Sequence, residues 1–165
     1  MKVSKACKEE AVTHHTLSPG LFLIHCPHGV CLGFSSMRTH KGPSLFFDLL
    51  CRRFREALPR ATIVYDNSCN AHHYCLAQEP YLFAGTRFLV DQFHFNENHS
   101  ACSTGYCVDQ YPNLAHVNTQ VAEQLNSRLR SLARRILCMT KQNVMHTIKH
   151  AVFAFNAEKT GIAYL

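Results

Sequence analysis

The sequence has few charged residues and no long hydrophobic run. No stretch approaches the roughly 18 consecutive apolar residues of a membrane-spanning helix, so a membrane protein is not expected. The first residues, MKVSKACKEEAV, contain no apolar core of a secretory signal. Charged residues make up 17% of the chain and hydrophobic residues 47%, a balance that favours a folded domain over a disordered chain. There is no internal repeat, linker or low-complexity tract, and 165 residues are enough for one domain with its own core.

Cysteine and histidine, in contrast, are abundant, with nine Cys and twelve His. An odd number of cysteines without a secretory signal favours reduced thiols and metal ligands over a framework of disulfides. The formal net charge of +6 fits a polyanionic partner without identifying one.

The hydrophobic pattern predicts an α/β fold. Residues 1–19 are polar and aperiodic and are expected to form a loose lead-in. Strands are expected at residues 21–25 and 30–35, and the Pro and Gly between them predict an antiparallel hairpin. A helix should begin near Pro43 and end before Pro59, followed by a strand at 61–65 that is parallel to its neighbour. Further along, we expect in order a helix at 70–78, an extended segment at 87–95, a loop at 96–112, a helix with an apolar stripe from Val117 to Ile136, and a last helix at 144–156.

A dense set of chemistry-bearing side chains follows the strand at 61–65. Asp66 ends that strand, and a carboxylate at the carboxyl end of a buried strand is a usual position for a functional group in α/β proteins. Eight Cys and His residues come next: Cys69, His72, His73, Cys75, His94, His99, Cys102 and Cys107. Cys26, His28 and Cys31 in the predicted hairpin are a second candidate set, but buried structural thiols beside a turn histidine are the commoner arrangement.

Three motifs carry a family resemblance. They are Y-D-x-x-C at residues 65–69, V-D-x-F-H-F-x-x-x-H-x-x-C-x-x-G-Y at 90–106, and N-x-Q-V-A-E-Q-x-N-S at 118–127. In this order they resemble the Kyakuja-Dileera-Zisupton transposases and the host proteins derived from them, over roughly residues 20–156. The resemblance implies an incomplete RNase H-like sheet with flanking helices in a domain at 20–165, with a zinc-binding insert at about 67–112.

The resemblance also implies a structural Zn²⁺ site. The motif positions that match give its four ligands: Cys69, His94, His99 and Cys102. Zinc prefers four such donors in a tetrahedron, and an insert with little apolar material of its own would gain stability from the metal. Cys75 and Cys107 are alternative ligands, and Asp91 is expected to orient a metal-binding histidine.

Two catalytic acids are implied, Asp66 and Glu123. DDE enzymes use three acids to hold two Mg²⁺ ions about 3.5–4 Å apart. The first acid belongs on a strand that precedes the hairpin, yet the only aspartates of the sequence are Asp48, Asp66, Asp91 and Asp109. We therefore expect a chain that is truncated at its amino end or has lost that strand, and that is inactive. A Glu opposite an apolar stripe is ordinarily just solvated, so the role of Glu123 depends on the resemblance.

Basic side chains around the end of one predicted helix suggest a phosphate-contacting face, although an ordinary basic surface has the same pattern. They are Arg128, Arg130, Arg134, Arg135 and Lys141. No helix-turn-helix signature accompanies them.

A Cys–His nucleophilic enzyme is the rival from another class, but no spacing singles out a pair. The resemblance implies a nuclear protein that acts on DNA. The alternative is a domesticated, non-catalytic DNA- or protein-binding module of a larger nuclear protein. Besides DNA, the expected partners are a second copy of the chain or a larger host polypeptide.

Overall fold

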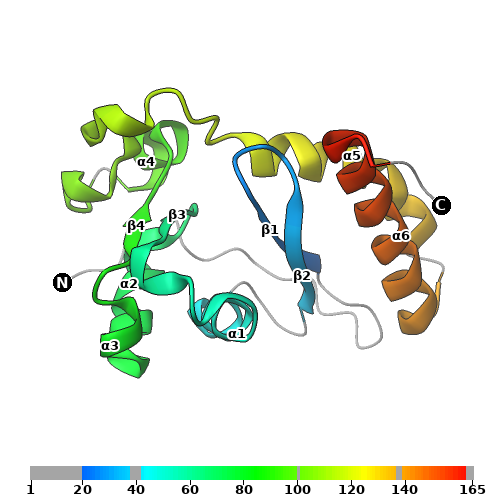
Figure 1. Cartoon of the computed structure of the whole chain (residues 1–165), viewed down its shortest axis with the longest axis horizontal. Helices are drawn as coiled ribbons and strands as arrows, with labels where there is room; N and C mark the ends of the chain where they lie inside the picture. Colours follow the sequence, from blue (N-terminus) through cyan, green and yellow to red (C-terminus); the bar gives the residue numbers. More distant parts are fainter. Residues whose placement is uncertain (1–19, 38–41, 100, 137–138, 163–165) are drawn as a thin grey trace. The chain divides into compact units, whose positions relative to one another are not determined.

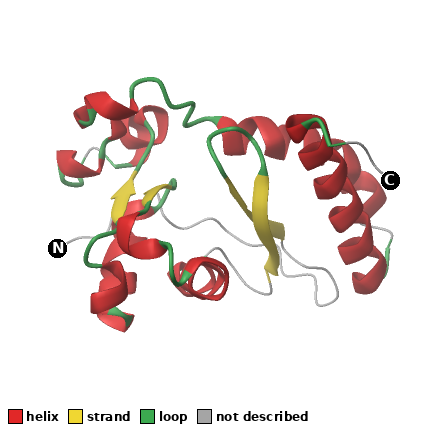
Figure 2. Cartoon of the chain, viewed as in Figure 1, coloured by secondary structure: helices red, strands yellow, loops and turns green. Residues whose placement is uncertain are grey.

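The computed structural model describes residues 20–37, 42–99, 101–136 and 139–162. It mixes small sheets with helices, as the α/β prediction required (Figure 1, Figure 2). The chain divides into two compact units, which we call the central unit (residues 42–117) and the terminal unit (residues 20–37 and 118–162). Over the described ranges, none of the helices combines the length and the apolarity needed to cross a membrane.

The terminal unit is a hairpin associated with two helices. β1 (Gly20–His25) pairs antiparallel with β2 (Cys31–Met37), which confirms the predicted hairpin, and Gly29 makes the turn with a φ of 85°. α5 (Val121–Ile136) contacts β1, and α6 (Lys141–Thr160) contacts β2. The predicted apolar stripe of α5 is buried where its residues recur at four-residue steps: Val121, Leu125 and Leu129.

One side chain ties α6 to β2. The side-chain carbonyl of Asn156 accepts the Cys31 backbone N–H at 2.8 Å, and its amide donates to the Cys31 carbonyl at 2.9 Å. The pairing of β1 with β2 becomes irregular between Ile24 and His25, opposite this position. Asn156 therefore satisfies both backbone groups of a residue at the start of a strand, as a neighbouring strand would.

The central unit contains a β-α-β arrangement. β3 (Thr62–Val64) pairs parallel with β4 (Arg87–Leu89), with Ile63 opposite Phe88. The crossover between the two strands is helical, as parallel pairing requires. The remaining elements, in chain order, are α1 (Pro43–Phe54), a 3₁₀ turn (Leu58–Arg60), α2 (Ser68–Gln78), α3 (Pro80–Phe83), α4 (Gln92–Asn98) and three 3₁₀ turns (Thr104–Tyr106, Val108–Gln110, Pro112–Leu114).

Aromatic rings make the core that fixes the ends of β3 and β4. Phe46 on α1 stacks on Tyr65, just past β3, with ring centroids 4.8 Å apart. Phe46 also meets Phe88 on β4 at 6.2 Å, and Phe88 meets the fully buried Phe83 at 6.0 Å. Aromatic pairs of this kind add to the free energy of apolar burial, so the strand ends are held from both sides.

One prediction is not confirmed and another is corrected. The described strands form two two-stranded sheets, and the RNase H-like sheet stays a prediction. Residues 92–95 belong to the segment predicted to be extended, at 87–95, but they form the first turn of α4. Asp91 caps this helix by accepting the His94 backbone N–H, and only Phe95 is buried while Phe93 is 58% exposed. Residues 1–19, the predicted lead-in, lie outside the described residues.

The Asn156 contact gives a stability prediction. Asn156→Ala leaves the Cys31 N–H and carbonyl without their protein partners, so the free energy of unfolding should fall by about 1–3 kcal/mol. Asn143→Ala, at an exposed position of the same helix, should change it by less than about 0.5 kcal/mol. Urea unfolding followed by circular dichroism measures both, and equal effects of the two substitutions would contradict the role given to Asn156.

Candidate metal centre

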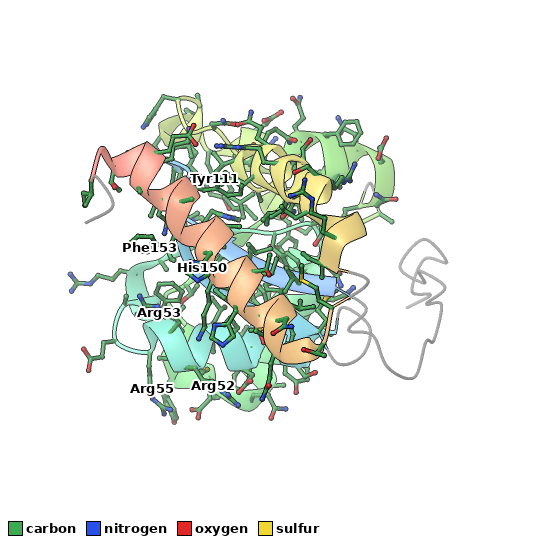
Figure 3. All side chains as sticks on the ribbon, turned by 90° about the vertical axis from the view of Figure 1, so that its right-hand side faces the viewer. Arg52, Arg53, Arg55, Tyr111, His150 and Phe153 are labelled. Atoms are coloured by element: carbon green, nitrogen blue, oxygen red, sulfur yellow. The ribbon has the colours of Figure 1, made fainter. Side chains whose placement is uncertain are left out.

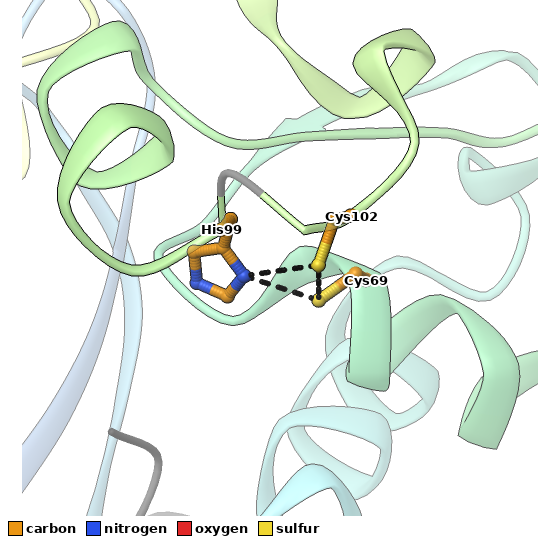
Figure 4. A group of neighbouring side chains, drawn as sticks. All are labelled: Cys69, His99 and Cys102. Atoms are coloured by element: carbon orange, nitrogen blue, oxygen red, sulfur yellow. Dashed lines mark hydrogen bonds between the residues drawn. The ribbon is translucent and has the colours of Figure 1, made fainter. Parts of the chain in front are cut away.

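Three of the four predicted zinc ligands come together in the central unit. The Cys69 Sγ lies 3.3 Å from the His99 Nδ1, the Cys102 Sγ lies 3.5 Å from the same nitrogen, and the two sulfurs are 3.5 Å apart (Figure 4). Cys69 and His99 are buried, and Cys102 is half-buried. Among the residues that the structure describes, this is the group of three or more Cys, His, Asp or Glu side chains with the spacing of a metal site.

The parallel pair of strands explains why these residues meet. Cys69 lies in the first turn of α2, which follows β3, and His99 is the carboxyl-terminal cap of α4, which follows β4. Since the carboxyl ends of parallel strands lie at the same edge of a sheet, the segments that follow them start side by side. A turn then brings Cys102 back, because its N–H donates to the His99 carbonyl at 2.8 Å.

A further backbone contact closes the segment that carries the ligands. Val90, directly after β4, forms a parallel bridge with Cys107. The Val90 N–H donates to the Tyr106 carbonyl at 2.7 Å, and the Val108 N–H donates to the Val90 carbonyl at 3.0 Å. The segment at residues 101–107 therefore ends beside Val90, where backbone contacts hold Cys107 next to the residue that follows β4.

The geometry of the three donors fits zinc. With metal–sulfur bonds of about 2.3 Å and metal–nitrogen bonds of about 2.0–2.1 Å, neighbouring donors of a tetrahedron are about 3.5–3.8 Å apart. Two of the observed separations, at 3.5 Å, equal the lower limit of this range, and the Cys69–His99 separation of 3.3 Å is slightly shorter. Two thiolates and an imidazole are borderline to soft donors, which favours zinc over Mg²⁺.

His94, the fourth predicted ligand, is not part of this group. Its Nδ1 lies 2.6 Å from the Asp91 Oδ2, and the Asp91 side chain is buried. Asp91 therefore makes the contact with a histidine that the sequence analysis expected, while its Oδ1 caps α4. The assignment of His94 as a ligand stays a prediction.

The alternative thiols lie outside the group as well. Cys75 is fully buried on α2, where burial and the neighbouring Cys51 raise the pKa of its thiol to about 12. A thiol with that pKa stays protonated at neutral pH and behaves as a small apolar side chain. Cys107 is buried with Val90 and Phe95 in a small apolar cluster, against which Cys102 and Tyr106 pack.

Sequence reasoning did not predict the contact between Tyr106 and His72 beside the thiols, although His72 is one of the eight Cys and His residues that it named. The Tyr106 hydroxyl lies 2.9 Å from the His72 Nδ1, and the His72 ring stacks on Phe88 at 4.8 Å. Burial raises the pKa of Tyr106, with a further rise from Cys69 and Cys102, so a neutral phenol lies close to the thiols. Burial is also the main cause of the lowered pKa of His72. The available signal was Gly105-Tyr106, which ends the second motif.

The two predicted catalytic acids lie in different units. Asp66 is half-buried directly after β3 in the central unit, and Glu123 is exposed in the first turn of α5 in the terminal unit. Neither belongs to a group of three or more metal-binding side chains within the described residues. The same holds for Cys26, His28 and Cys31, and the Cys31 thiol donates to the Gly33 carbonyl at 3.4 Å.

The structure describes three side chains of the predicted basic face. Arg130 and Arg135 are exposed on α5. Arg128 is engaged within the terminal unit, with one guanidinium nitrogen 2.6 Å from Glu158 and its centre 4.3 Å above the Phe155 ring. The side chains of Arg134 and Lys141 lie outside those that the structure describes.

The fold and the site define a mixed α/β protein with a Cys-His-Cys centre suited to zinc. A sequence model of the Kyakuja-Dileera-Zisupton transposase family matches residues 3–156, and the chain therefore belongs to that family. No curated protein and no solved structure gives a significant match. Membership indicates a transposase-like origin, and it suggests interaction with DNA and a function in the nucleus.

The centre predicts a metal content that depends on its cysteines. Protein purified without chelators should carry about one equivalent of Zn²⁺, and chelation should lower its melting temperature because metal binding contributes to folding. Cys102→Ala should lose the metal, whereas Cys26→Ala, in the hairpin turn, should retain it. Elemental analysis and thermal unfolding test this, and zinc-free wild-type protein would contradict it.

Proposed function

We propose that the chain is a DDE-type transposase-derived domain in which the Cys/His centre holds a structural Zn²⁺. The observation that carries this proposal is the convergence of Cys69, His99 and Cys102 in a chain that belongs to the transposase family. The donors are largely buried, which suits a metal that supports folding better than one that meets a substrate.

Zinc at this position would stabilise the segment that carries Asp66. Cys69 lies three residues after Asp66, at the start of α2, and the metal would cross-link this turn to the loop at residues 99–102. Residues 104–114 form only short 3₁₀ turns, which contribute little stability of their own. The metal would therefore fix both the loop and the strand end that presents the carboxylate.

We do not expect this chain alone to cleave or join DNA. Asp66 and Glu123 match two of the three acids of a DDE site, and no aspartate precedes β1 in this sequence. A missing bridging carboxylate would leave two metal ions without a shared ligand and remove electrostatic stabilisation of the leaving oxygen. The second candidate is a domesticated nuclear module that binds without cleaving, and the excess of Lys and Arg in residues 118–162 supports it.

The distribution of charge favours the terminal unit as the part that contacts DNA. Its residues 118–162 hold seven Lys and Arg against Glu123 and Glu158, whereas the central unit holds five Arg against seven Asp and Glu. Arg52 on α1 and Arg55 directly after it, both labelled in Figure 3, are also paired locally: Arg52 lies 2.8 Å from Asp48 and Arg55 lies 3.8 Å from Glu79. Phosphate attraction should therefore depend on α5 and α6, with Arg130 and Arg135 as the exposed side chains of the predicted face.

The catalytic part of the proposal predicts no strand cleavage or joining. Labelled duplexes carrying candidate transposon ends should remain intact with the 165-residue chain and Mg²⁺ or Mn²⁺, because the loss of one electrostatic term costs several kcal/mol of barrier, roughly 3–4 as for a removed oxyanion donor. Gel electrophoresis follows the products, with Asp66→Asn and Glu123→Gln as controls for contaminating nuclease. Turnover that both substitutions abolish would show that the acidic site is complete.

The binding part predicts strong salt dependence. The slope of log affinity against log salt concentration should become shallower by about one unit for each phosphate-contacting arginine that is removed. Arg130→Ala and Arg135→Ala should each have this effect, and Arg52→Ala on α1 should not. Fluorescence anisotropy with a labelled duplex measures the slopes. Equal slopes for all three variants would contradict a DNA-contacting face on α5.

A further inference from the structure

We propose that Cys69 and Cys102 form a dithiol that a hydroperoxide oxidises to a disulfide, which makes this pair an oxidative modification site of the chain. The two Sγ atoms lie 3.5 Å apart (Figure 4), although the residues are 33 positions apart in the sequence. Formation of the disulfide needs two thiols in contact and does not depend on a bound metal. Only its effect on zinc rests on the proposed function.

The positions of the two thiols allow the sulfurs to approach each other. A disulfide has a sulfur–sulfur bond of about 2.05 Å, so the gap must close by about 1.5 Å. Cys69 is held in the first turn of α2, whereas Cys102 lies between α4 and the 3₁₀ turn at Thr104–Tyr106, outside any helix or strand. Rotation about the Cα–Cβ bonds, together with a small shift of the Cys102 backbone, can therefore supply the movement.

Access of the oxidant distinguishes the two sulfurs. Cys102 is half-buried, whereas Cys69 is 7% exposed. Cys75, on the same helix as Cys69, is fully buried, and Cys107 is buried in an apolar cluster. A small peroxide should therefore react first at Cys102, and Cys69 should be the thiol that resolves the product because its sulfur already lies beside it.

The reaction consumes one hydrogen peroxide for each disulfide. The Cys102 sulfur attacks one peroxide oxygen, the O–O bond breaks, and a sulfenic acid and one water form. The Cys69 sulfur then attacks the Cys102 sulfur, so that the S–S bond forms while the S–O bond breaks, and the hydroxyl leaves with the proton of Cys69 as a second water. The two thiols together lose two electrons and two protons, and the peroxide is reduced to two waters.

Oxidation and metal binding compete for the same sulfur atoms. A metal binds the thiolate form of cysteine, and a disulfide sulfur has no such charge to offer. Once the disulfide forms, His99 is the one donor of the three that is still able to bind, and a structural zinc site needs four. The oxidised chain should therefore release the metal, and reduction should restore the site.

The experiment treats the reduced, metal-free full chain with hydrogen peroxide and then labels the thiols that are left with iodoacetamide in denaturant. Intact mass should show seven labels in place of the nine of the reduced chain, because one bridged pair removes two of the nine cysteines. The same treatment of the chain in denaturant is the control for pairing that the fold does not direct, and it should give a mixture of bridges.

Peptide mapping locates the bridge, and the choice of protease matters. Trypsin leaves Cys69 on one peptide with Cys75. It leaves Cys102 on another with Cys107, so a link between the two tryptic peptides does not identify the pair. Chymotrypsin also cleaves after the tyrosine that lies between the two cysteines of each peptide. The bridged chymotryptic fragments should then contain Cys69 and Cys102 alone.

Serine variants of the full chain test the pairing. Cys102→Ser should form no bridge and keep its eight labels after peroxide. Two matched controls should each lose two of their eight labels: Cys107→Ser, at a buried thiol on the same tryptic peptide, and Cys26→Ser, at a half-buried thiol of the terminal unit. Circular dichroism verifies that each variant folds. Nine labels in the oxidised wild-type chain, or a bridge between other cysteines, would overturn the proposal.

A measurement with zinc separates this proposal from the proposed function. Peroxide should release about one equivalent of Zn²⁺ from the zinc-loaded chain to a chromophoric indicator for each disulfide formed, and dithiothreitol should restore binding. A wild-type chain that binds no zinc yet forms the disulfide would contradict the proposed function and support the dithiol. A chain that binds zinc but forms no bridge between Cys69 and Cys102 when metal-free would contradict the dithiol and leave the proposed function standing.

Discussion

The parallel pairing of β3 with β4 is the contact on which the candidate site depends. It is short, three residues from each strand, yet it places the start of α2 and the segment after β4 at one edge. This alignment positions Asp66 and Cys69 after β3 and the segment that carries His99 and Cys102 after β4. The Val90–Cys107 bridge adds one more parallel contact directly after β4. Packing of Phe46 against Tyr65 and Phe88 keeps the two strand ends in place. A substitution in this aromatic core would therefore disturb the geometry of the candidate metal site without changing any of its ligands.

Environment separates cysteines that look alike in sequence. Cys69 and Cys75 lie on the same helix, six residues apart. Cys69 faces a histidine and a second thiol, where a metal would stabilise the thiolate. Cys75 faces the apolar interior beside Cys51, where nothing stabilises the charged form, and its pKa rises to about 12. A count of thiols predicts that a metal site exists, but only their surroundings decide which of them can bind.

Local pattern predicted the hairpin and the buried stripe of α5, because each depends on spacing within a short segment, whereas the three converging donors were predicted from the family resemblance. Long-range relations were less accessible. The parallel partner of β3 is β4, and a strand of three residues is too short to be predicted with its partner from sequence. The alternation of Phe93 and Phe95 resembles a strand, although Asp91 caps a helix there. The contact of Tyr106 with His72 joins residues 34 apart and had no periodic signal. These three features depend on which segments meet in the folded chain, which residue type alone does not predict.

The Asn156 contact with Cys31 has a consequence for the order in which the chain folds. It joins residues 125 apart, and the whole central unit lies between them in the sequence. On the ribosome the hairpin emerges long before α6, so it must wait for its helical partners while the contiguous central unit is already complete. Closing so long a loop is entropically costly, but a central unit that has folded first shortens the effective loop.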